Sequence, residues 1–292
     1  MKNVVQSMIV SIVVNFILIV IKLVVGIISN YKSLVADAIH SFSDMSTDLV
    51  AIFGQWLAVK KADDKHPYGH GKIEYITSII IGGFILALGI GLINSTITGN
   101  IAPSKYTNIA LIVVIITIIL KYGLAKYVYY KGKIDNNSIL LARAHENMED
   151  VFSSIGVFIT ITLSLLTKYV PIFKYADKVG GLIISLLIIK TSFNILRDNI
   201  NAIIGEREQN QNVIDKIKNI ILSISDVLSI DDLVVMKLGS YYQIILDVGL
   251  DAKMTLKDAH NVAHKIEKEL IDSNLKIKYV TVHINPSAKS IS

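Results

Sequence analysis

The sequence predicts a membrane protein with two parts, an all-α six-helix transmembrane domain and a small α+β cytoplasmic domain. Hydrophobic residues make up 52% of the 292 residues and charged residues only 18%, a combination that soluble domains rarely show. Six stretches reach the roughly 20 apolar residues that cross a bilayer. The long apolar stretches stop at about residue 205, so we expect a transmembrane domain at 1–205 and a cytoplasmic domain at 206–292.

Short polar segments separate the six predicted spans. Lys and Arg gather at or after the ends of the second, fourth and sixth spans, among them Lys60, Lys72, Lys121 and Arg197. The positive-inside rule therefore places both termini in the cytoplasm of a multi-pass protein of the plasma membrane. This placement also accounts for the net charge of +5 without a nucleic-acid partner. The predicted spans lie near residues 4–28, 33–59, 74–98, 107–130, 139–166 and 178–202.

The C-terminal part shows alternating helix and strand patterns in the order α-β-β-α-β. Two amphipathic segments, 212–223 and 256–271, have helical periodicity, whereas 233–236, 242–248 and 279–284 are rich in β-branched residues. Gly239-Ser240 provides a turn between the first two strands. We expect a two-layer domain of ferredoxin-like, metallochaperone-like topology, and its small size favours dimerisation.

The second span carries ionisable residues on one helical face. Asp37, His40, Ser41 and Asp44 recur every three or four residues. Each charged group at membrane depth costs about 2.5 to 3.5 kcal/mol on insertion scales, and such groups normally mark an ion or proton pathway. They could instead form hydrogen bonds between helices, but a His and several acids on one stripe favour a cation site.

The fifth span offers two pairs of ligand-type residues. Glu146 and Asp150 are one helical turn apart, and so are His145 and Glu149, but the two pairs face directions about 100° apart. Two helices that each contribute a pair would form a four-ligand cage suited to a divalent transition ion. The spacing leaves open which pair lines the bundle, and a charged patch at the helix start is the structural alternative.

Two further groups of metal-ligating side chains lie outside the spans. The loop after the second span contains Asp63, His66 and His70 close together, although such a loop could simply be solvated. The C-terminal part contains His260, His264 and His283, but histidines are common on protein surfaces, so these three could also be ordinary surface residues. Cysteine is absent, which excludes thiolate metal sites and disulfides.

The segments 36–44 (ADAIHSFSD) and 62–74 (ADDKHPYGHGKIE) together resemble the cation diffusion facilitator family of divalent metal/proton antiporters. The resemblance covers nearly the whole chain. It implies a non-enzymatic exporter that binds the metal from the cytoplasm, changes to an outward-facing state and exchanges the metal for protons. The transported ion would be Zn, Mn, Fe or Co, with no further cofactor, and the protein would act as a homodimer in the lipid bilayer.

The resemblance also implies roles for residues at matching positions. It places transport-site ligands on the second and fifth spans, a second metal site on the loop, a weaker one in the cytoplasmic domain, and a lysine interlock at the dimer interface. The remaining polar residues of the two spans would be outer-shell or alternative ligands. The transport-site ligands would be His40, Asp44, Glu146 and Asp150, and the loop site would be Asp63, His66 and His70. The cytoplasmic site would be Asp231, His260 and His283, and the interlock lysine would be Lys72. The outer-shell or alternative ligands would be Asp37, His145 and Glu149.

The chain departs from the family pattern at several of these positions. Glu146 occupies a position that is commonly His in zinc exporters, and this harder ligand set moves the expected preference toward manganese or iron. In the cytoplasmic site, Asp231 stands for a frequent His, Ile245 replaces another ligand and Asn285 replaces an Asp. The acidic partner expected for Lys72 is Asn201 here, with an aspartate three positions earlier.

Two other functions fit parts of the pattern. One is a metal-sensing or assembly scaffold of the same fold, which would not need intact ligands in both spans. The other is a membrane-embedded metal-dependent hydrolase, in which the acids would supply a base. The sequence contains neither an HExxH motif nor a nucleophile elbow, so transport is the favoured function.

Overall fold

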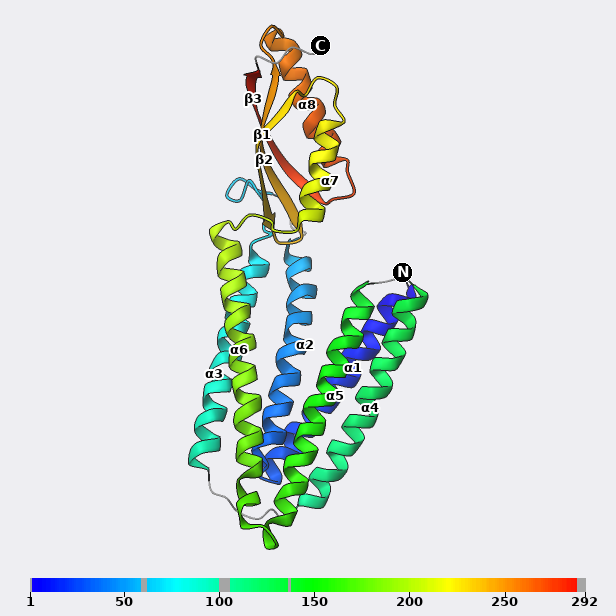
Figure 1. The fold of residues 1–292 in the computed structure, drawn as a ribbon, viewed down its shortest axis with the longest axis vertical. Coiled ribbons are helices and arrows are strands. Elements are labelled where there is room, and N and C mark those ends of the chain that lie inside the picture. The colour runs from blue at the N-terminus through cyan, green and yellow to red at the C-terminus, as the bar shows by residue number, and fades with distance from the viewer. Residues whose placement is uncertain (1, 59–61, 100–105, 136–137, 288–292) are drawn as a thin grey trace. The chain divides into compact units, whose positions relative to one another are not determined.

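The computed structural model describes residues 2–58, 62–99, 106–135 and 138–287, with side chains described at 9–46, 62–99, 106–135 and 140–287. The helices and strands follow the order shown in Figure 1. They are α1 (Lys2–Ile28), α2 (Lys32–Ala58), α3 (Ile73–Thr98), α4 (Thr107–Ile134), α5 (Ser138–Leu165), two 3-10 turns (Leu166–Lys168 and Pro171–Tyr175), α6 (Ala176–Ile204), α7 (Gln211–Leu222), β1 (Ser229–Leu238), β2 (Tyr241–Asp251), α8 (Leu256–Ile271) and β3 (Ile277–Ser287).

The chain packs as two compact units. The first comprises Met1–Leu49 and Ile80–Leu196, and the second comprises Val50–Ile79 and Arg197–Ser292. The last part of α2 and the first part of α3 therefore belong to the same unit as the C-terminal part of the chain. The domain boundary that the sequence predicts, at residues 205/206, remains a prediction.

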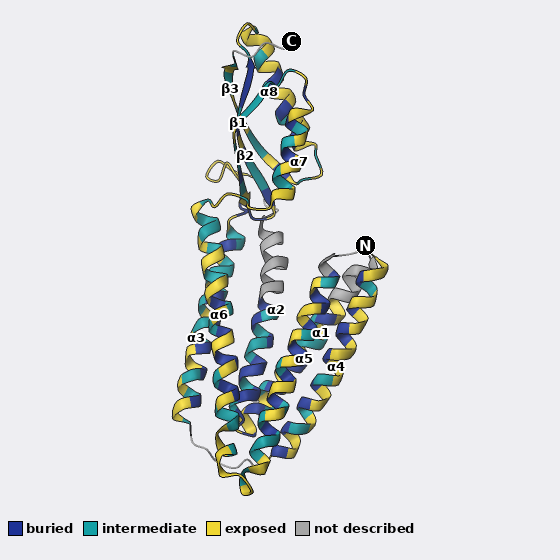
Figure 2. Cartoon of the chain, in the orientation of Figure 1, coloured by how far each residue is buried: buried dark blue, intermediate teal, exposed yellow. Residues whose placement is uncertain are grey.

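Helices α1 to α6 form the predicted six-helix transmembrane domain. Among the described residues, five helical segments are long and apolar enough to cross a membrane, in α1, α3, α4, α5 and α6. Helix α2, with 27 residues, is also long enough to cross a membrane, but it carries Asp37, His40 and Asp44. Large apolar side chains such as Phe16, Ile80 and Ile119 are exposed, which suits contact with lipid. Figure 2 shows exposed residues recurring along α3, α4 and α6.

The start of α2 is fixed by a side chain from α6. The Asp177 carboxylate accepts the backbone N–H groups of Lys32 at 2.8 Å and of Ser33 at 3.0 Å, and the Ser33 hydroxyl at 2.6 Å. These are N–H groups that a helix leaves without internal partners, and a carboxylate near them is also favoured by the helix dipole. A residue 144 positions away thus sets where α2 begins.

Apolar packing and one close approach position α1 against α2. Gly26 lies so near Val35 that an added Cβ would be 2.8 Å from a Val35 methyl carbon. Fully buried Leu34, Ile161 and Ile188 belong to the core that α2 shares with α5 and α6. The polar face of α2 is therefore held toward the interior of the bundle.

The second unit contains the predicted α-β-β-α-β fold. The sheet has the order β1-β2-β3, with β1 and β2 antiparallel and β2 and β3 parallel. Alternate residues of β2, Ile244, Leu246 and Val248, are fully buried in a core that also contains Ile217 of α7 and Ile266 of α8. The strands are longer than the sequence predicts because their polar ends also pair in the sheet.

Candidate functional site

One pocket of the first unit lies between α1, α2 and α5. Its volume is about 10 Å³, close to the space that a single water molecule needs. Three of the predicted transport ligands line it, Asp44 of α2 together with Glu146 and Asp150 of α5. The complete lining is Asn15, Ser41, Asp44, Met45, Arg143, Glu146, Asn147 and Asp150.

His40, the fourth predicted ligand, lies beside the lining residue Asp44. Its Nε2 atom is 3.9 Å from an Asp44 carboxylate oxygen, one helical turn along α2. The Nδ1 atom of His40 is buried and has no hydrogen-bond partner among the described residues. The four predicted ligands are thus gathered in one region, although they do not meet as one tight ligand group in this conformation.

Asp150 is the buried centre of this region. Its carboxylate accepts a hydrogen bond from the Ser41 hydroxyl at 3.0 Å and forms an ion pair with Lys121 of α4. The Lys121 side chain is 1% exposed and that of Asp150 is 6% exposed. Both carboxylate oxygens therefore already have partners from two other helices.

Asp37 forms a separate buried ion pair. Its carboxylate lies 2.7 Å from the Nζ atom of Lys22 in α1, and both side chains are fully buried. The hydroxyls of Ser153 and Ser154 donate to the two Asp37 oxygens at 2.6 and 3.0 Å, and Lys22 also donates to Ser154. Asp37 does not line the pocket. It connects α1, α2 and α5 through these contacts.

The structure distinguishes the two residue pairs of α5. Glu146 and Asp150 line the pocket, whereas His145 and Glu149 do not. Of these four residues only Asp150 is buried, and the other three are exposed. Asn15 lines the pocket and its Nδ2 donates to the Asn147 amide oxygen at 3.5 Å.

The predicted loop group forms a compact cluster in the second unit. The ligand atoms of Asp63, His66 and His70 lie within 4.8 Å of one another, and this is the only group of three or more that close among the described residues. Asp63 is 3.0 Å from His66 Nδ1 and 3.5 Å from His70 Nε2. The backbone N–H of His66 lowers the pKa of Asp63, and the two imidazoles act in the same direction. This carboxylate is thus kept ionised, as a metal ligand must be.

Residues of the sheet hold the loop that carries this cluster. The Tyr241 hydroxyl donates to the Tyr68 carbonyl at 2.7 Å and accepts the Gly71 N–H at 3.3 Å. Gly69 has φ +74°, a conformation that favours glycine, and lies close to the same hydroxyl. Tyr279 of β3 packs edge-on against Tyr68, with ring centroids 5.3 Å apart. Loop and sheet therefore form one packed region.

The other predicted positions have different partners. Asp231 accepts a hydrogen bond from Asn285 at 2.9 Å, which lowers the Asp231 pKa, and His260 packs against His264. The described residues of one chain do not bring Asp231, His260 and His283 into a ligand group, so this site stays a prediction. The Nζ atom of Lys72 donates to the Ile203 carbonyl at 3.3 Å.

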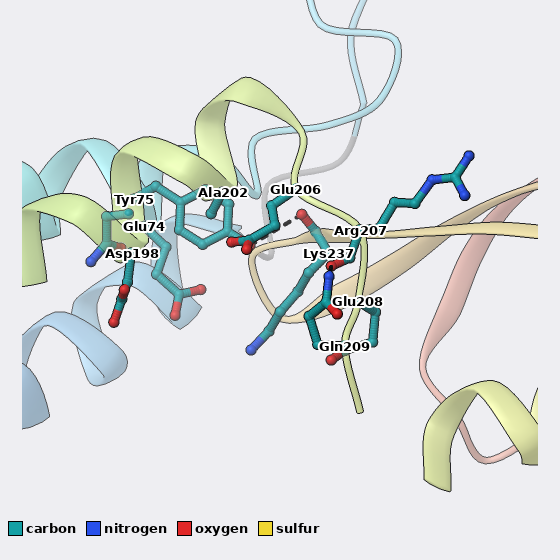
Figure 3. Close-up of a pocket in the computed structure, with 10 residues that line it drawn as sticks. Glu74, Tyr75, Asp198, Ala202, Glu206, Arg207, Glu208, Gln209 and Lys237 are labelled. Atoms are coloured by element: carbon teal, nitrogen blue, oxygen red, sulfur yellow. Dashed lines mark hydrogen bonds between the residues drawn. The ribbon is translucent and has the colours of Figure 1, made fainter. Parts of the chain in front are cut away.

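A larger pocket of about 390 Å³ lies within the second unit (Figure 3). Its wall includes four carboxylates, those of Glu74, Asp198, Glu206 and Glu208, with the cations Arg207 and Lys237. Burial opposes ionisation of Glu208, but the N–H of Asn210 and the Tyr242 hydroxyl outweigh it and lower the pKa. The carboxylates outnumber the cations, but among the described residues they do not form a group of three ligand atoms close enough to hold one ion, so we assign no ion to this pocket.

Two lysines are buried inside the bundle, and the sequence prediction misplaces one of them. Lys121 counts there toward the cytoplasmic positive charge, and this is wrong because its side chain is buried and paired inside the bundle. The position of Lys121 in the sequence could have indicated that its side chain is buried. Lys121 lies about 14 Å, or nine residues, before the predicted end of its span, too far for a lysine to reach water along the helix. Lys22 lies similarly within an apolar run.

Comparison with known proteins decides the family. The profile described as the cation efflux transmembrane domain matches residues 8–204, and that of the cation efflux protein cytoplasmic domain matches residues 210–287. The chain belongs to the cation efflux family. It is therefore a member of the cation diffusion facilitators that its sequence resembles, a family of transporters of divalent metal cations.

Curated relatives align with this cation efflux protein over nearly its full length. The uncharacterized transporter MJ0449 of Methanocaldococcus jannaschii is 30% identical over 97% of this chain and 99% of its own. The manganese efflux system protein MneP of Bacillus subtilis is 26% identical, with 95% and 94% covered. The cadmium, cobalt and zinc/H(+)-K(+) antiporter of the same organism is 23% identical, with 92% and 85% covered.

The Lys22–Asp37 pair yields a first testable prediction for the stability of this transporter. Lys22→Met leaves a buried carboxylate without its counter-ion, so the free energy of unfolding should fall by about 3–5 kcal/mol. Adding Asp37→Leu should restore part of the loss. Unfolding of the detergent-solubilised protein in SDS, followed by circular dichroism, measures both changes. Lys126→Met, at an exposed position of α4, is the control, and equal stability of Lys22→Met and this control would contradict the prediction.

Proposed function

We propose that this protein exports a divalent transition-metal ion from the cytoplasm in exchange for protons. The supporting observation is that carboxylates from two membrane helices, Asp44, Glu146 and Asp150, line one pocket, with His40 beside them. Charged groups within membrane helices are costly, and they normally mark an ion or proton pathway. Residues 1–205 would form the transport domain and 206–292 the cytoplasmic domain, with both termini in the cytoplasm of a homodimer in the plasma membrane.

The exchange follows from the chemistry of the ligands. A carboxylate or an imidazole nitrogen binds either a proton or a metal ion through the same lone pair, so protonation expels the metal. An imidazole has an ordinary pKa of about 6.5 and therefore changes its charge near physiological pH. Protons that enter from outside would release the metal there, and the deprotonated site would bind again on the cytoplasmic side.

Manganese is the substrate that we favour. The proposed site offers one imidazole and three carboxylates, and oxygen ligands suit Mn²⁺ better than they suit softer ions. The name of the relative MneP, a manganese efflux protein, agrees with this choice. Another relative is named for cadmium, cobalt and zinc. We expect Glu146 to set the preference, because the resemblance places it where zinc exporters commonly have His.

Removing a transport ligand should abolish metal flux. Asp44→Ala or Asp150→Ala should lower Mn²⁺ transport in proteoliposomes by more than the roughly 10–100-fold typical of losing an outer-shell partner. Glu149→Gln changes an exposed acid next to Asp150 and should retain transport. If Asp44→Ala moves Mn²⁺ as well as the parent, the site assignment is wrong. Loss of flux in Glu149→Gln alone would instead favour the other face of α5.

Exchanging one ligand should change the metal preference. Glu146→His replaces a hard oxygen ligand by a nitrogen that suits Zn²⁺. In competition flux assays with zinc, manganese, iron and cobalt across a pH gradient, the Zn²⁺ to Mn²⁺ ratio should rise about tenfold or more. Glu146→Asp, which keeps a carboxylate, should leave the ratio near that of the parent. An unchanged ratio in Glu146→His would show that this position does not contact the transported ion.

We also propose that Asp63, His66 and His70 bind a second divalent ion outside the transport site. Their ligand atoms already lie within 4.8 Å, and the buried Nδ1 of His70 has no partner among the described residues. The His70→Ala variant should therefore bind one metal ion fewer per chain in equilibrium dialysis. His264→Ala, on the exposed face of α8, should keep the parent stoichiometry. Unchanged stoichiometry in His70→Ala would contradict the loop site.

A further inference from the structure

Lys121 places a positive charge where the proposed transport site would hold its metal ion. The Nζ atom forms an ion pair with Asp150, and the Lys121 side chain is only 1% exposed. The other Asp150 oxygen accepts the Ser41 hydroxyl at 3.0 Å. An ammonium group and a metal ion are both cations that bind carboxylate lone pairs. Lys121 and a metal ion would therefore compete for the same carboxylate.

The charges around the pocket show why one side-chain cation must move. The carboxylates of Asp44, Glu146 and Asp150 face the cations Arg143 and Lys121, which leaves a single net negative charge when the nearby imidazole is neutral. A divalent ion would make this group of charges positive, and like charges repel, most strongly around the buried Asp150 and Lys121. The net charge of the site is zero with the metal ion bound if one of the two side-chain cations leaves.

Lys121 is better suited to leave than Arg143. It contacts the ligand Asp150 directly, and its charge sits at the end of a flexible four-carbon stem. Arg143 carries a planar guanidinium with a fixed fork of donors, and it is one turn before Asn147 on the helix that supplies two ligands. The pocket of about 10 Å³ offers no room for a hydrated ion while Lys121 stays bound to Asp150.

The ion pair of the second buried lysine, Lys22, differs from that of Lys121 because it has more contacts and lies outside the pocket. Lys22 contacts both Asp37 and Ser154, and Asp37 also accepts the hydroxyls of Ser153 and Ser154. This group lies outside the lining of the pocket and contains none of the proposed ligands. The two pairs are chemically alike, but only that of Lys121 includes a residue that would bind metal.

We propose that Lys121 is a tethered cation that neutralises Asp150 in the metal-free protein and is displaced when the metal binds. This inference rests on the proposed function and deepens it, because it names the group that fills the site between transport cycles. Lys121 would lower the apparent metal affinity, since the protein binds metal only in the fraction of molecules in which Asp150 is free of the lysine. Lys121 would also allow the metal-free protein to change between its outward-facing and inward-facing states without leaving the Asp150 carboxylate unpaired.

The test measures Mn²⁺ binding to the full-length protein in detergent at pH 8, in a His70→Ala background that removes the loop site. Electron paramagnetic resonance of free Mn²⁺ gives the Kd. Lys121→Met keeps the length of the side chain without its charge, and it should bind Mn²⁺ about tenfold or more tightly than the background protein. A residue that only braced the bundle would weaken binding when it is lost. A Kd equal to or higher than that of the background protein would overturn the proposal.

Matched variants separate this outcome from a failure of the transport site. Lys121→Arg keeps the cation and should bind close to the background Kd, whereas Lys126→Met removes an exposed lysine of the same helix and should change nothing. Lys121→Gln replaces Lys121→Met if the latter does not elute as a single species, and it should show the same gain. If Asp44→Ala fails to weaken binding in the background protein, the proposed transport site is wrong, whatever Lys121 does.

Discussion

The structure depends on the compensation of carboxylates that are buried in a bundle of membrane helices. Asp37 and Asp150 are both removed from solvent, and each has a lysine from another helix as its counter-ion, Lys22 and Lys121 respectively. A buried charge without a partner is strongly destabilising, and a paired one gains little over apolar packing. These pairs therefore contribute chiefly by specifying which helices meet. They connect α2 and α5, which carry the proposed ligands, to α1 and α4.

The two pairs differ in how completely the carboxylate is engaged. Asp37 accepts a lysine and two serine hydroxyls, so its position is set by several contacts at once. Asp150 has a lysine and one hydroxyl, and it lies at the pocket with the other acids. Helices α2 and α5 contribute side chains to both groups, because serines of each helix contact the aspartate of the other. Under the proposal for Lys121, the Asp37 pair would stay fixed while the Asp150 site exchanges its cation.

The second unit shows how a loop of ligand-type residues is given a definite shape. Asp63 accepts backbone N–H groups within its own loop, and the Tyr241 hydroxyl joins the loop at Tyr68 and Gly71 to the sheet. The sheet in turn is fixed by the apolar core beneath α7 and α8. Side chains that would be mobile in a free loop are therefore brought within the distance that one metal ion can span.

The sequence alone determined the six helices, the α-β-β-α-β order and the identity of the acids and histidines near Asp44 and Asp150. These features are local, because hydrophobic periodicity and segment length are contained in short stretches of chain. The tertiary structure decided which face of α5 lines the pocket, since Glu146 and His145 lie on neighbouring faces of equal plausibility. It also decided the partners of Lys22, Lys121 and Asp177. Those contacts join residues that are 15 to 145 positions apart, and no periodic pattern specifies a partner at such separations.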